Sequence, residues 1–388
     1  MKLNCEPLGK HVRLVDCRNF AVITTTVLGI SIDKEFMPSV ANVIGTDLSR
    51  YKLISKGLFA CNPMHVGRDE RLPIALYEDE ALAIVSPAYF VFEIIDPKII
   101  NEEYLMMWFR RPEFDRECWF MTDGSVRGGI SWEDICRIEL PVPQYDRQCE
   151  IVEAYRTITN RIAFKKAIND NLEATTMSLY KSWFIDYEPF DLDNEGLPVG
   201  WCKVKLNDKL STSTQSINPQ KMDCDFVWHY SIPAYDNDKL PSKDTPSSIL
   251  SNKYIVPQNA ILVSKLNPDT KRIWRSIPCF ENAICSTEFI VFSTKEPTHR
   301  AFYYLLFNTG SFIDFLVSNA TGSTNSRMRV KPTSSLDFEF ICPPNEVIDS
   351  FCRKVEPLLQ KIEENHLEIR KLKELIPIAI AKMMSSSR

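Results

Sequence analysis

Apolar positions divide this chain into short globular segments and two long helical ones. Runs rich in β-branched and aromatic residues, such as IVSPAYFVFEII (84–95) and STEFIVFS (286–293), are typical of strands. The apolar segments NEEYLMMWF (101–109) and HRAFYYLLF (299–307) predict short helices. Because strands and short helices are mixed in both halves, the pattern predicts an α+β fold.

Each half continues into a segment of about 40 residues whose apolar positions are spaced alternately by four and three, which predicts a coiled coil of roughly 60 Å. Polar seam positions at Lys165, Asn169 and Asn365 weaken such packing but fix its register. We expect a kink or an early helix end at Pro357 and Pro377. The seam residues are Ile151, Tyr155, Ile158, Ile162, Leu172, Thr176, Leu179 and Trp183, then Phe351, Val355, Leu358, Ile362, Ile369, Leu372, Ile376, Ala379 and Met383.

The chain repeats itself at an offset of 200 residues. Two matched helical seams are better explained by mutual pairing than by two amphipathic helices that each pack only on their own domain. Between matched segments lie two Gly-Ser loops, GSVRGGIS (124–131) and GSTNSRMRVK (322–331). The matched segments are AIVSPAYFVF (83–92) with AICSTEFIVF (283–292), EYLMMWF (103–109) with YYLLFNT (303–309), and RIELPVP (137–143) with DFEFICP (337–343).

The repeat predicts an alternating architecture of two globular α/β domains and two long helices that pair with each other as a coiled coil. An acidic, Pro-containing linker separates the halves. The expected boundaries are 1–143 for the first domain, 144–185 for the central helix, 186–198 for the linker, 199–343 for the second domain and 344–388 for the distal helix.

Composition limits the class of protein. With 388 residues, 44% of them apolar, the chain can bury two or more cores. No apolar run approaches the roughly 18 residues that span a bilayer, and MKLNCEP is no signal peptide, so we expect no membrane association. The twelve cysteines form no CxxC pair, and the nearest two, Cys279 and Cys285, are poorly spaced for a metal. Unpaired cysteines at this density indicate the cytoplasm.

The net charge of −5 does not exclude a polyanionic partner. The segment between Lys181 and Lys203 carries five acidic residues and no basic one, so the rest of the chain is neutral overall. Two basic runs, SKLNPDTKRIWR (264–275) and NSRMRVK (325–331), therefore stand out as candidate nucleic-acid contacts. Their basic residues are Lys265, Lys271, Arg272, Arg275, Arg327, Arg329 and Lys331.

Three segments resemble the specificity subunit of type I restriction–modification systems. LPVPQYDRQCEIV (140–152) enters the first long helix, SLYKSWFIDYEPF (178–190) leaves it, and GLPVGWCKVKL (196–206) opens the second half. In this order, and with the repeat, the resemblance covers essentially the whole chain. IVSPAYFVF and GSVRGGIS also look like the family's target-recognition domain. The second copy departs from the pattern, because FEFICPPNEVIDSF (338–351) lacks the counterpart of Gln148.

The resemblance implies a non-catalytic subunit that reads double-stranded DNA. Each domain would recognise one part of an asymmetric, interrupted site. The two long helices would pair as an antiparallel coiled coil, set the spacing between the half-sites and dock two methyltransferase subunits. Those partners would bind S-adenosylmethionine and methylate adenine N6, so no cofactor is expected in this chain. Motor-nuclease subunits could join to complete a restriction enzyme.

Catalytic motifs are not found in the sequence. NPMH (62–65) and CPPN (342–345) both depart from the Asn/Asp-Pro-Pro-aromatic motif of adenine methylases. Glu80, Asp96 and Lys98 could suggest a metal-dependent nuclease, but Pro97 fits poorly in a strand-borne metal site. We therefore expect no catalysis by this chain.

The two Gly-Ser loops are either plain connectors or DNA-reading loops. Glycines permit close backbone approach, serine can donate to phosphate, and arginine can bind guanine or a phosphate. Repetition and the family resemblance favour DNA reading. A cytosolic coiled-coil scaffold without DNA binding is the alternative, but it does not explain two matched domains. The loop residues that we expect to contact DNA are Gly124, Ser125, Arg127, Ser323, Asn325, Arg327 and Arg329.

Overall fold

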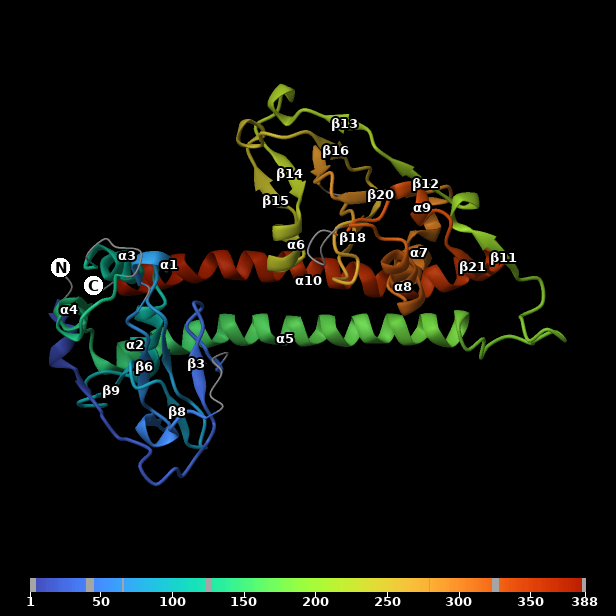
Figure 1. Ribbon diagram of the computed structural model, residues 1–388. Coiled ribbons are helices and arrows are strands. Elements are labelled where there is room, and N and C mark those ends of the chain that lie inside the picture. Colours follow the sequence, from blue (N-terminus) through green and yellow to red (C-terminus); the bar gives the residue numbers. More distant parts are fainter. Residues whose placement is uncertain are drawn as a thin grey trace. The chain divides into compact units, whose positions relative to one another are not determined.

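A computed structural model describes residues 5–39, 45–64, 66–122, 128–278, 280–322 and 328–385. Its internal contacts divide the chain into two compact units. The first unit is Met1–Asn160 with Lys373–Arg388, and the second is Arg161–Leu372. The two division points lie inside the long helices α5 (Tyr145–Phe184) and α10 (Asn345–Ser385), which are both labelled in Figure 1.

The first unit is built on a four-stranded antiparallel sheet with the order β2-β9-β6-β7. Three two-stranded sheets, β1-β10, β3-β4 and β5-β8, complete its strands. The strands are β1 (Cys5–Pro7), β2 (Val12–Leu14), β3 (Leu28–Ile30), β4 (Phe36–Pro38), β5 (Lys52–Ile54), β6 (Phe59–Cys61), β7 (Ile74–Leu76), β8 (Ala83–Val85), β9 (Phe90–Ile94) and β10 (Glu139–Pro141), and the short helices are α1 (Val66–Asp69), α2 (Glu102–Phe109), α3 (Pro112–Phe120) and α4 (Trp132–Arg137).

The second unit has a four-stranded sheet with the order β12-β20-β17-β18 and a five-stranded sheet with the order β13-β16-β19-β14-β15. A further pair joins β11 to β21. The strands are β11 (Cys202–Lys205), β12 (Leu210–Ser213), β13 (Ser216–Ile217), β14 (Val227–Tyr230), β15 (Ser242–Asp244), β16 (Lys253–Ile255), β17 (Ile261–Ser264), β18 (Ile273–Arg275), β19 (Ala283–Cys285), β20 (Phe289–Thr294) and β21 (Glu339–Cys342), and the short helices are α6 (Ile232–Asp238), α7 (Arg300–Phe307), α8 (Gly310–Ser318) and α9 (Pro332–Ser335).

The two domains share one topology, which confirms the predicted fold class. The order β2-β9-β6-β7 corresponds strand by strand to β12-β20-β17-β18. The helices α2, α3 and α4 are followed by β10 and α5, just as α7, α8 and α9 are followed by β21 and α10. In both copies the strand before the long helix pairs with the first strand of its domain, β1 with β10 and β11 with β21.

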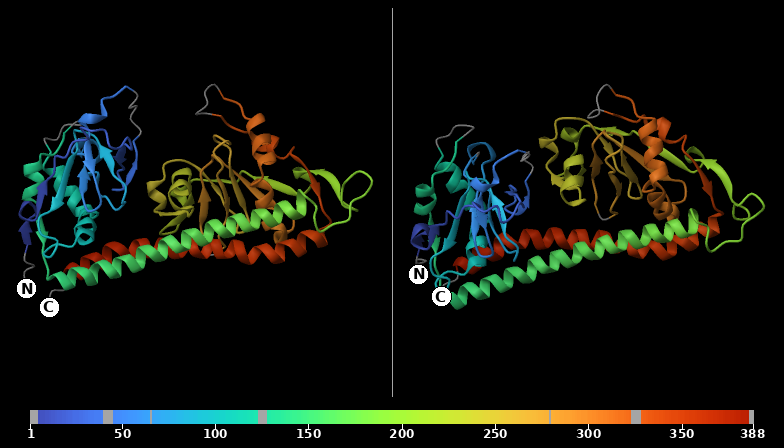
Figure 2. Two further views of the ribbon diagram at one scale, coloured as in Figure 1. Left: turned by 90° about the horizontal axis from the view of Figure 1, so that it is seen from below. Right: turned by 60° about the horizontal axis from the view of Figure 1, so that its bottom comes forward.

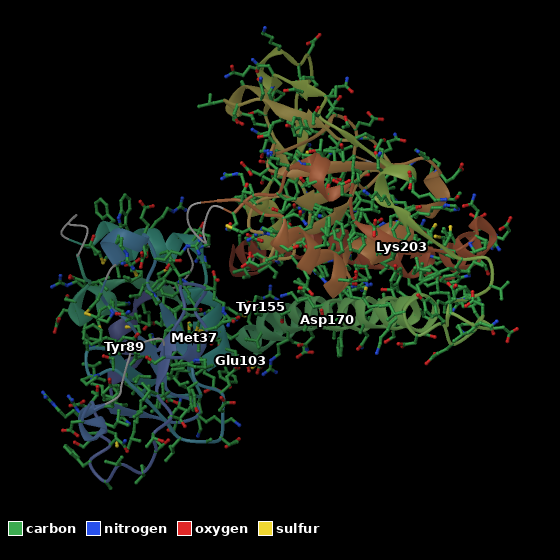
Figure 3. All side chains as sticks on the ribbon, turned by 45° about the vertical axis from the view of Figure 1, so that its right-hand side comes forward. Met37, Tyr89, Glu103, Tyr155, Asp170 and Lys203 are labelled. Atoms are coloured by element: carbon green, nitrogen blue, oxygen red, sulfur yellow. The ribbon has the colours of Figure 1, made fainter. Side chains whose placement is uncertain are left out.

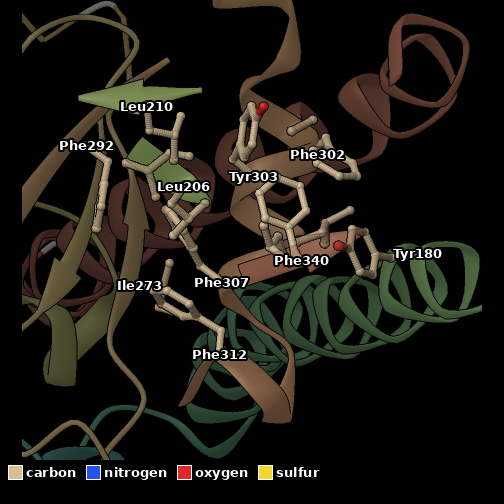
Figure 4. Packing of buried hydrophobic residues seen from close by; sticks show 14 of the residues in the cluster. Tyr180, Leu206, Leu210, Ile273, Phe292, Phe302, Tyr303, Phe307, Phe312 and Phe340 are labelled. Carbon is tan, nitrogen blue, oxygen red and sulfur yellow. The ribbon is translucent and has the colours of Figure 1, made fainter. Parts of the chain in front are cut away.

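The two short helices that the sequence predicts form as α2 and α7, the first with a side-chain cap and the second with extensive aromatic packing. The side chain of Asn101 accepts hydrogen bonds from the amides of Glu103 and Tyr104 at the start of α2. Thr309 caps α8 in the second domain in the same way. The apolar faces of α7 and α8 then pack into the main core of the second unit, where Phe302, Phe307 and Phe312 are fully buried (Figure 4).

Within the second unit the two long helices lie side by side in opposite directions (Figure 2). Lys165 Nζ on α5 donates to Asn365 Oδ1 on α10 at 3.0 Å. One turn further along α5, Asn169 Oδ1 accepts from Asn365 Nδ2 at 2.7 Å, and Asn169 Nδ2 contacts the carbonyl of Ile362 at 3.4 Å. Later positions on α5 therefore meet earlier positions on α10, as predicted. These buried amides pair with each other, which favours one helix register.

The expected seam residues whose side chains the structure describes are all buried or half-buried, but α10 differs from the prediction at several positions. Leu359, not Leu358, enters the core of the second unit, and Ile380, not Ala379, enters the core of the first. The expected interruption does not occur, because α10 is helical through Pro357 and Pro377. The buried seam residues are Ile151, Ile162, Thr176, Phe351, Val355, Ile362 and Ile369; Tyr155, Ile158, Leu172, Leu179, Trp183, Leu358, Leu372, Ile376 and Ala379 are half-buried, and the Met383 side chain lies outside the described residues.

Candidate nucleic-acid interface

The two Gly-Ser loops fall partly outside the residues that the structure describes. This holds for Gly124, Ser125 and Arg127 in the first loop and for Ser323, Asn325 and Arg327 in the second. Their contacts with DNA stay predictions from the sequence. The structure describes the end of the first loop (128–131) and both ends of the second (322 and 328–331), and these residues define the candidate interface.

In the second unit the end of the loop pairs with the residues that directly follow β17, an interior strand of the main sheet. Arg329 forms bridges with Thr321 and with Leu266, and the amide of Val330 donates to the carbonyl of Lys265 at 3.0 Å. The Arg329 side chain is 45% exposed and contacts the Glu288 carboxylate at 3.0 Å. This hydrogen bond raises the pKa of the Arg329 guanidinium. An exposed ion pair of this kind is weak, so a phosphate can compete with Glu288 for Arg329.

In the first unit the end of the loop packs against α1. The amide of Gly67 donates to the carbonyl of Gly128 at 3.0 Å, and the amide of Ile130 donates to the carbonyl of Pro63 at 3.1 Å. A Cβ atom at Gly129 would lie 3.0 Å from the Pro63 oxygen, so this close approach favours glycine. The backbone of this loop end is therefore fixed by contacts with the segment around α1.

Arg68 on α1 is a candidate contact that the sequence reasoning missed. Its side chain is 57% exposed beside Gly67 and pairs with Asp69 at 2.6 Å. Hydrogen bonding to Asp69 raises the pKa of Arg68. In the sequence, Arg68 stands in the charge-balanced run GRDER (67–71), which offers no basic cluster to find. Its place beside the loop becomes visible only once Gly67 and Gly128 are brought together by folding.

The basic run SKLNPDTKRIWR does not form one basic surface. Lys265 is half-buried beside the loop end, whereas Arg272 pairs with Asp236 of α6 at 2.6 Å. Lys271 is exposed; its Nζ lies 3.4 Å from the carbonyl of Asn308 and lines an open pocket of the second unit. Lys265 therefore remains part of the candidate interface, whereas Arg272 and Lys271 contact residues away from the loop end.

The expectation that Arg275 contacts DNA is wrong. It is 4% exposed and forms ion pairs with Glu356 and Glu363 of α10. Arg300, also buried, lies 3.6 Å from Glu356. A guanidinium enclosed by two carboxylates in the interior has little surface to offer a phosphate. Arg275 therefore belongs to the packing of the second domain on α10 rather than to the DNA interface.

Gln148, which belongs to one of the segments that resemble the family, also has a structural role. It is fully buried at the start of α5, where its Oε1 accepts from the amide of Asn101 at 2.9 Å and its Nε2 donates to the carbonyl of Ile99 at 2.8 Å. Gln148 thus ties α5 to the beginning of α2. In the second copy Ile348 occupies the corresponding position and is buried in the apolar core. The departure at this position therefore changes packing rather than a DNA contact.

Neither a membrane span nor a metal site is found in the part of the chain that the structure describes. No described helix combines the length and the apolar character needed to cross a bilayer. Among the same residues, no cluster of three His, Cys, Asp or Glu side chains is arranged to hold a metal ion.

Sequence comparisons connect the chain to known proteins. No family model matches it. It is 23% identical over 321 residues to the type I restriction enzyme MjaIX specificity subunit of Methanocaldococcus jannaschii, covering 76% of this chain and 71% of the relative. It is 19% identical over 372 residues to the type I restriction enzyme HindI specificity subunit of Haemophilus influenzae, covering 76% and 79%. These relatives confirm the resemblance that the sequence motifs indicate.

Structural comparison supports the fold. The crystal structure of the type I restriction–modification S subunit from M. genitalium superposes with a TM-score of 0.60 and 11% identity. The similarity covers 100% of this chain and 98% of the other. The long-helix architecture with two α+β domains is therefore shared with a solved S subunit.

Proposed function

We propose that this chain is the DNA-specificity subunit of a type I restriction–modification complex. The observation that carries the proposal is its duplicated architecture. Two domains with the same order of elements each continue into a long helix, in a chain whose relatives are type I restriction enzyme specificity subunits. A duplicated reader can recognise two different half-sites, because the loops of the two copies differ in sequence.

In this role each domain reads one part of an interrupted double-stranded DNA site. The loop around Arg127 and the exposed Arg68 serve the first domain, and the loop around Arg327 with Arg329 and Lys265 serves the second. The helices α5 and α10 set the distance between the half-sites and dock two methyltransferase subunits. Those partners bind S-adenosylmethionine and transfer its methyl group to adenine N6. The chain supplies recognition, and motor-nuclease subunits would add restriction.

Substitutions in the two loops test this assignment. Arg127→Ala is expected to act on one half-site and Arg327→Ala on the other. If the arginine reads a base edge, the loss is about 1–3 kcal/mol and relaxes preference at one base pair. If it contacts a phosphate, all sequences bind more weakly and the salt slope falls by about one ion.

Binding is measured with the methyltransferase present, at several salt concentrations, on the cognate site and on its single-base variants. Arg13→Ala is the matched control, because Arg13 is an exposed arginine of the first domain that pairs with Glu93 on the neighbouring strand. If affinity, specificity and salt slope are unchanged in both loop variants, the loops are connectors and do not contact DNA.

A further inference from the structure

Each domain presents an exposed arginine beside the described end of its Gly-Ser loop. In the second domain this residue is Arg329, and in the first it is Arg68 on α1. Both arginines are bound by a neighbouring carboxylate, Arg329 by Glu288 and Arg68 by Asp69. The atoms that form these two ion pairs leave the same edge of each guanidinium open.

The carboxylates bind the side of the guanidinium that carries Nε. Arg329 Nε donates to Glu288 Oε2 at 3.0 Å, and its Nη2 donates to Oε1 at 3.2 Å. Arg68 Nε donates to Asp69 Oδ1 at 2.6 Å, and its Nη2 donates to Oδ2 at 2.9 Å. Since a guanidinium has five N–H donors, both Nη1 donors and one Nη2 donor are left over. Neither Nη1 atom has a hydrogen-bond partner in the part of the chain that the structure describes.

The backbone at each arginine is also held in place. Arg329 and Thr321 exchange two backbone hydrogen bonds, both at 2.9 Å. Arg68 follows Gly67, whose amide donates to the carbonyl of Gly128 at the loop end. An arginine that is held through both its backbone and its side chain loses less conformational freedom when it binds a partner. The two guanidinium groups are therefore already oriented in the free chain.

The two domains build this arrangement at different positions of the sequence. Ala88 stands in the first domain where the second has Glu288, and the amide of each donates to a serine hydroxyl two residues earlier, at 3.3 and 3.2 Å. Tyr89, which follows Ala88, is labelled in Figure 3. Gly129 likewise stands where the second domain has Arg329, 200 residues further on. The first domain thus supplies its arginine and its carboxylate from α1 instead, so the repeat alone does not account for the shared arrangement.

The open edge of each guanidinium matches one base in the major groove of DNA. Its Nη1 and Nη2 donors form a planar fork, and guanine presents two adjacent acceptors, O6 and N7. Adenine presents an acceptor beside a donor, thymine presents an acceptor beside a methyl group, and cytosine presents a donor. Guanine is therefore the base that can accept from both donors at once.

A phosphate matches these two arginines less well. The bound carboxylate offsets much of the positive charge that would attract the DNA backbone. A phosphate that took the Nε and Nη2 donors of Arg329 would have to displace Glu288. A base edge can be reached while the ion pair stays intact.

We propose that Arg68 and Arg329 each read one guanine, Arg68 in the half-site of the first domain and Arg329 in the half-site of the second. Asp69 and Glu288 are positioning residues, which hold the guanidinium by its Nε side and leave the other edge for guanine O6 and N7. This inference rests on the proposed DNA-reading function and adds to it the identity of one base pair in each half-site. Each half-site therefore contains at least one G·C pair.

The test uses the complex with the methyltransferase and the DNA site that methylome sequencing identifies. Arg329→Lys keeps the charge but loses the fork, so it should lower discrimination at one G·C pair of one half-site by about 5- to 140-fold. The salt slope should stay unchanged, because the number of positive charges is the same. Arg68→Lys should have the same effect on the other half-site. Binding is measured on all single-base variants of the site at several salt concentrations.

Glu288→Gln tests the positioning role. It should lower discrimination at the same G·C pair as Arg329→Lys, and it should raise the salt slope by about one ion because the charge of Arg329 is no longer offset. Arg13→Lys is the matched control, since Arg13 is an exposed arginine that Glu93 binds on the main sheet of the first domain. This control should leave both half-sites unchanged. In each variant, the half-site that the substituted domain does not read reports that the chain is folded.

Wild-type discrimination at every G·C pair in Arg329→Lys or in Arg68→Lys overturns the proposal. A half-site without a G·C pair overturns it as well, and so does an effect of both lysine variants on the same half-site. If Glu288→Gln changes neither discrimination nor the salt slope, the positioning role is refuted and the proposal with it. These outcomes leave the DNA-reading function in place, whereas a wild-type complex that prefers no DNA site refutes that function and this inference together.

Discussion

Matched heptad insertions in α5 and α10 are expected to lengthen the non-specific spacer of the recognised DNA site by up to about three base pairs. Seven helical residues add about 10 Å, and base pairs are stacked about 3.4 Å apart. The insertions belong at Asn160/Arg161 and Leu372/Lys373, where the two units divide, so each unit keeps its own contacts. Duplicating residues 161–167 and 366–372 keeps the seam spacing and repeats the contacts of Glu368 with Arg161 and Lys165.

The modified site is identified by methylome sequencing in cells that contain the partner methyltransferase. A heptad inserted in α5 alone is the control, and it should abolish methylation because the two seams no longer align. A doubly inserted variant that methylates the original site with its original spacer would show that the helices do not set the distance.

Lys34→Met is expected to destabilise the first unit by about 3–5 kcal/mol. Lys34 is 4% exposed and donates to Asp115 Oδ1 at 2.7 Å and to the carbonyl of Phe109. Once the ammonium is removed, the buried Asp115 carboxylate keeps one hydrogen-bond donor among the described residues, the amide of Leu72 at 3.1 Å. Burial lowers the pKa of Lys34, so the charge is already costly and depends on this partner.

Hydrogen exchange of the full-length chain measures the effect without requiring two-state unfolding. Amides of β6 and β9 should exchange about 10²-fold to several thousandfold faster, since each 1.4 kcal/mol is about tenfold. The control Lys56→Met removes an exposed pair with Glu80 and should cost at most about 1 kcal/mol. Adding Asp115→Leu to Lys34→Met should recover part of the loss. Less than a tenfold change in Lys34→Met would contradict the account.

The repeat and the helix pairing could be predicted because both leave a periodic pattern in the sequence. The exact buried face of α10 could not be predicted from the sequence, because α10 is covered by α5 on one side and by the second domain on another. Leu359 faces that domain's core and is therefore buried although it lies outside the 4-3 seam. Pro357 and Pro377 are both exposed, so each costs a backbone hydrogen bond without disturbing the packing of the helix.

The candidate interface was harder to predict, because a basic residue in the sequence does not reveal its partner. Arg275 and Arg272 stand in one basic run, but their carboxylate partners come from α10 and α6, far away in the chain. Arg68 shows the opposite case, since only the contact between Gly67 and Gly128 places it beside a loop. Long-range contacts therefore decide which arginines remain exposed.

Domain exchange followed by methylome sequencing tests the central claim most directly. Residues 1–143 are replaced by the corresponding domain of another specificity subunit, and N6-methyladenine is mapped in cells that contain the partner methyltransferase. The account predicts a two-part methylated motif that is absent without this chain, and that changes in one half only after the exchange. A motif that persists without the chain, or one that changes in both halves, would contradict it.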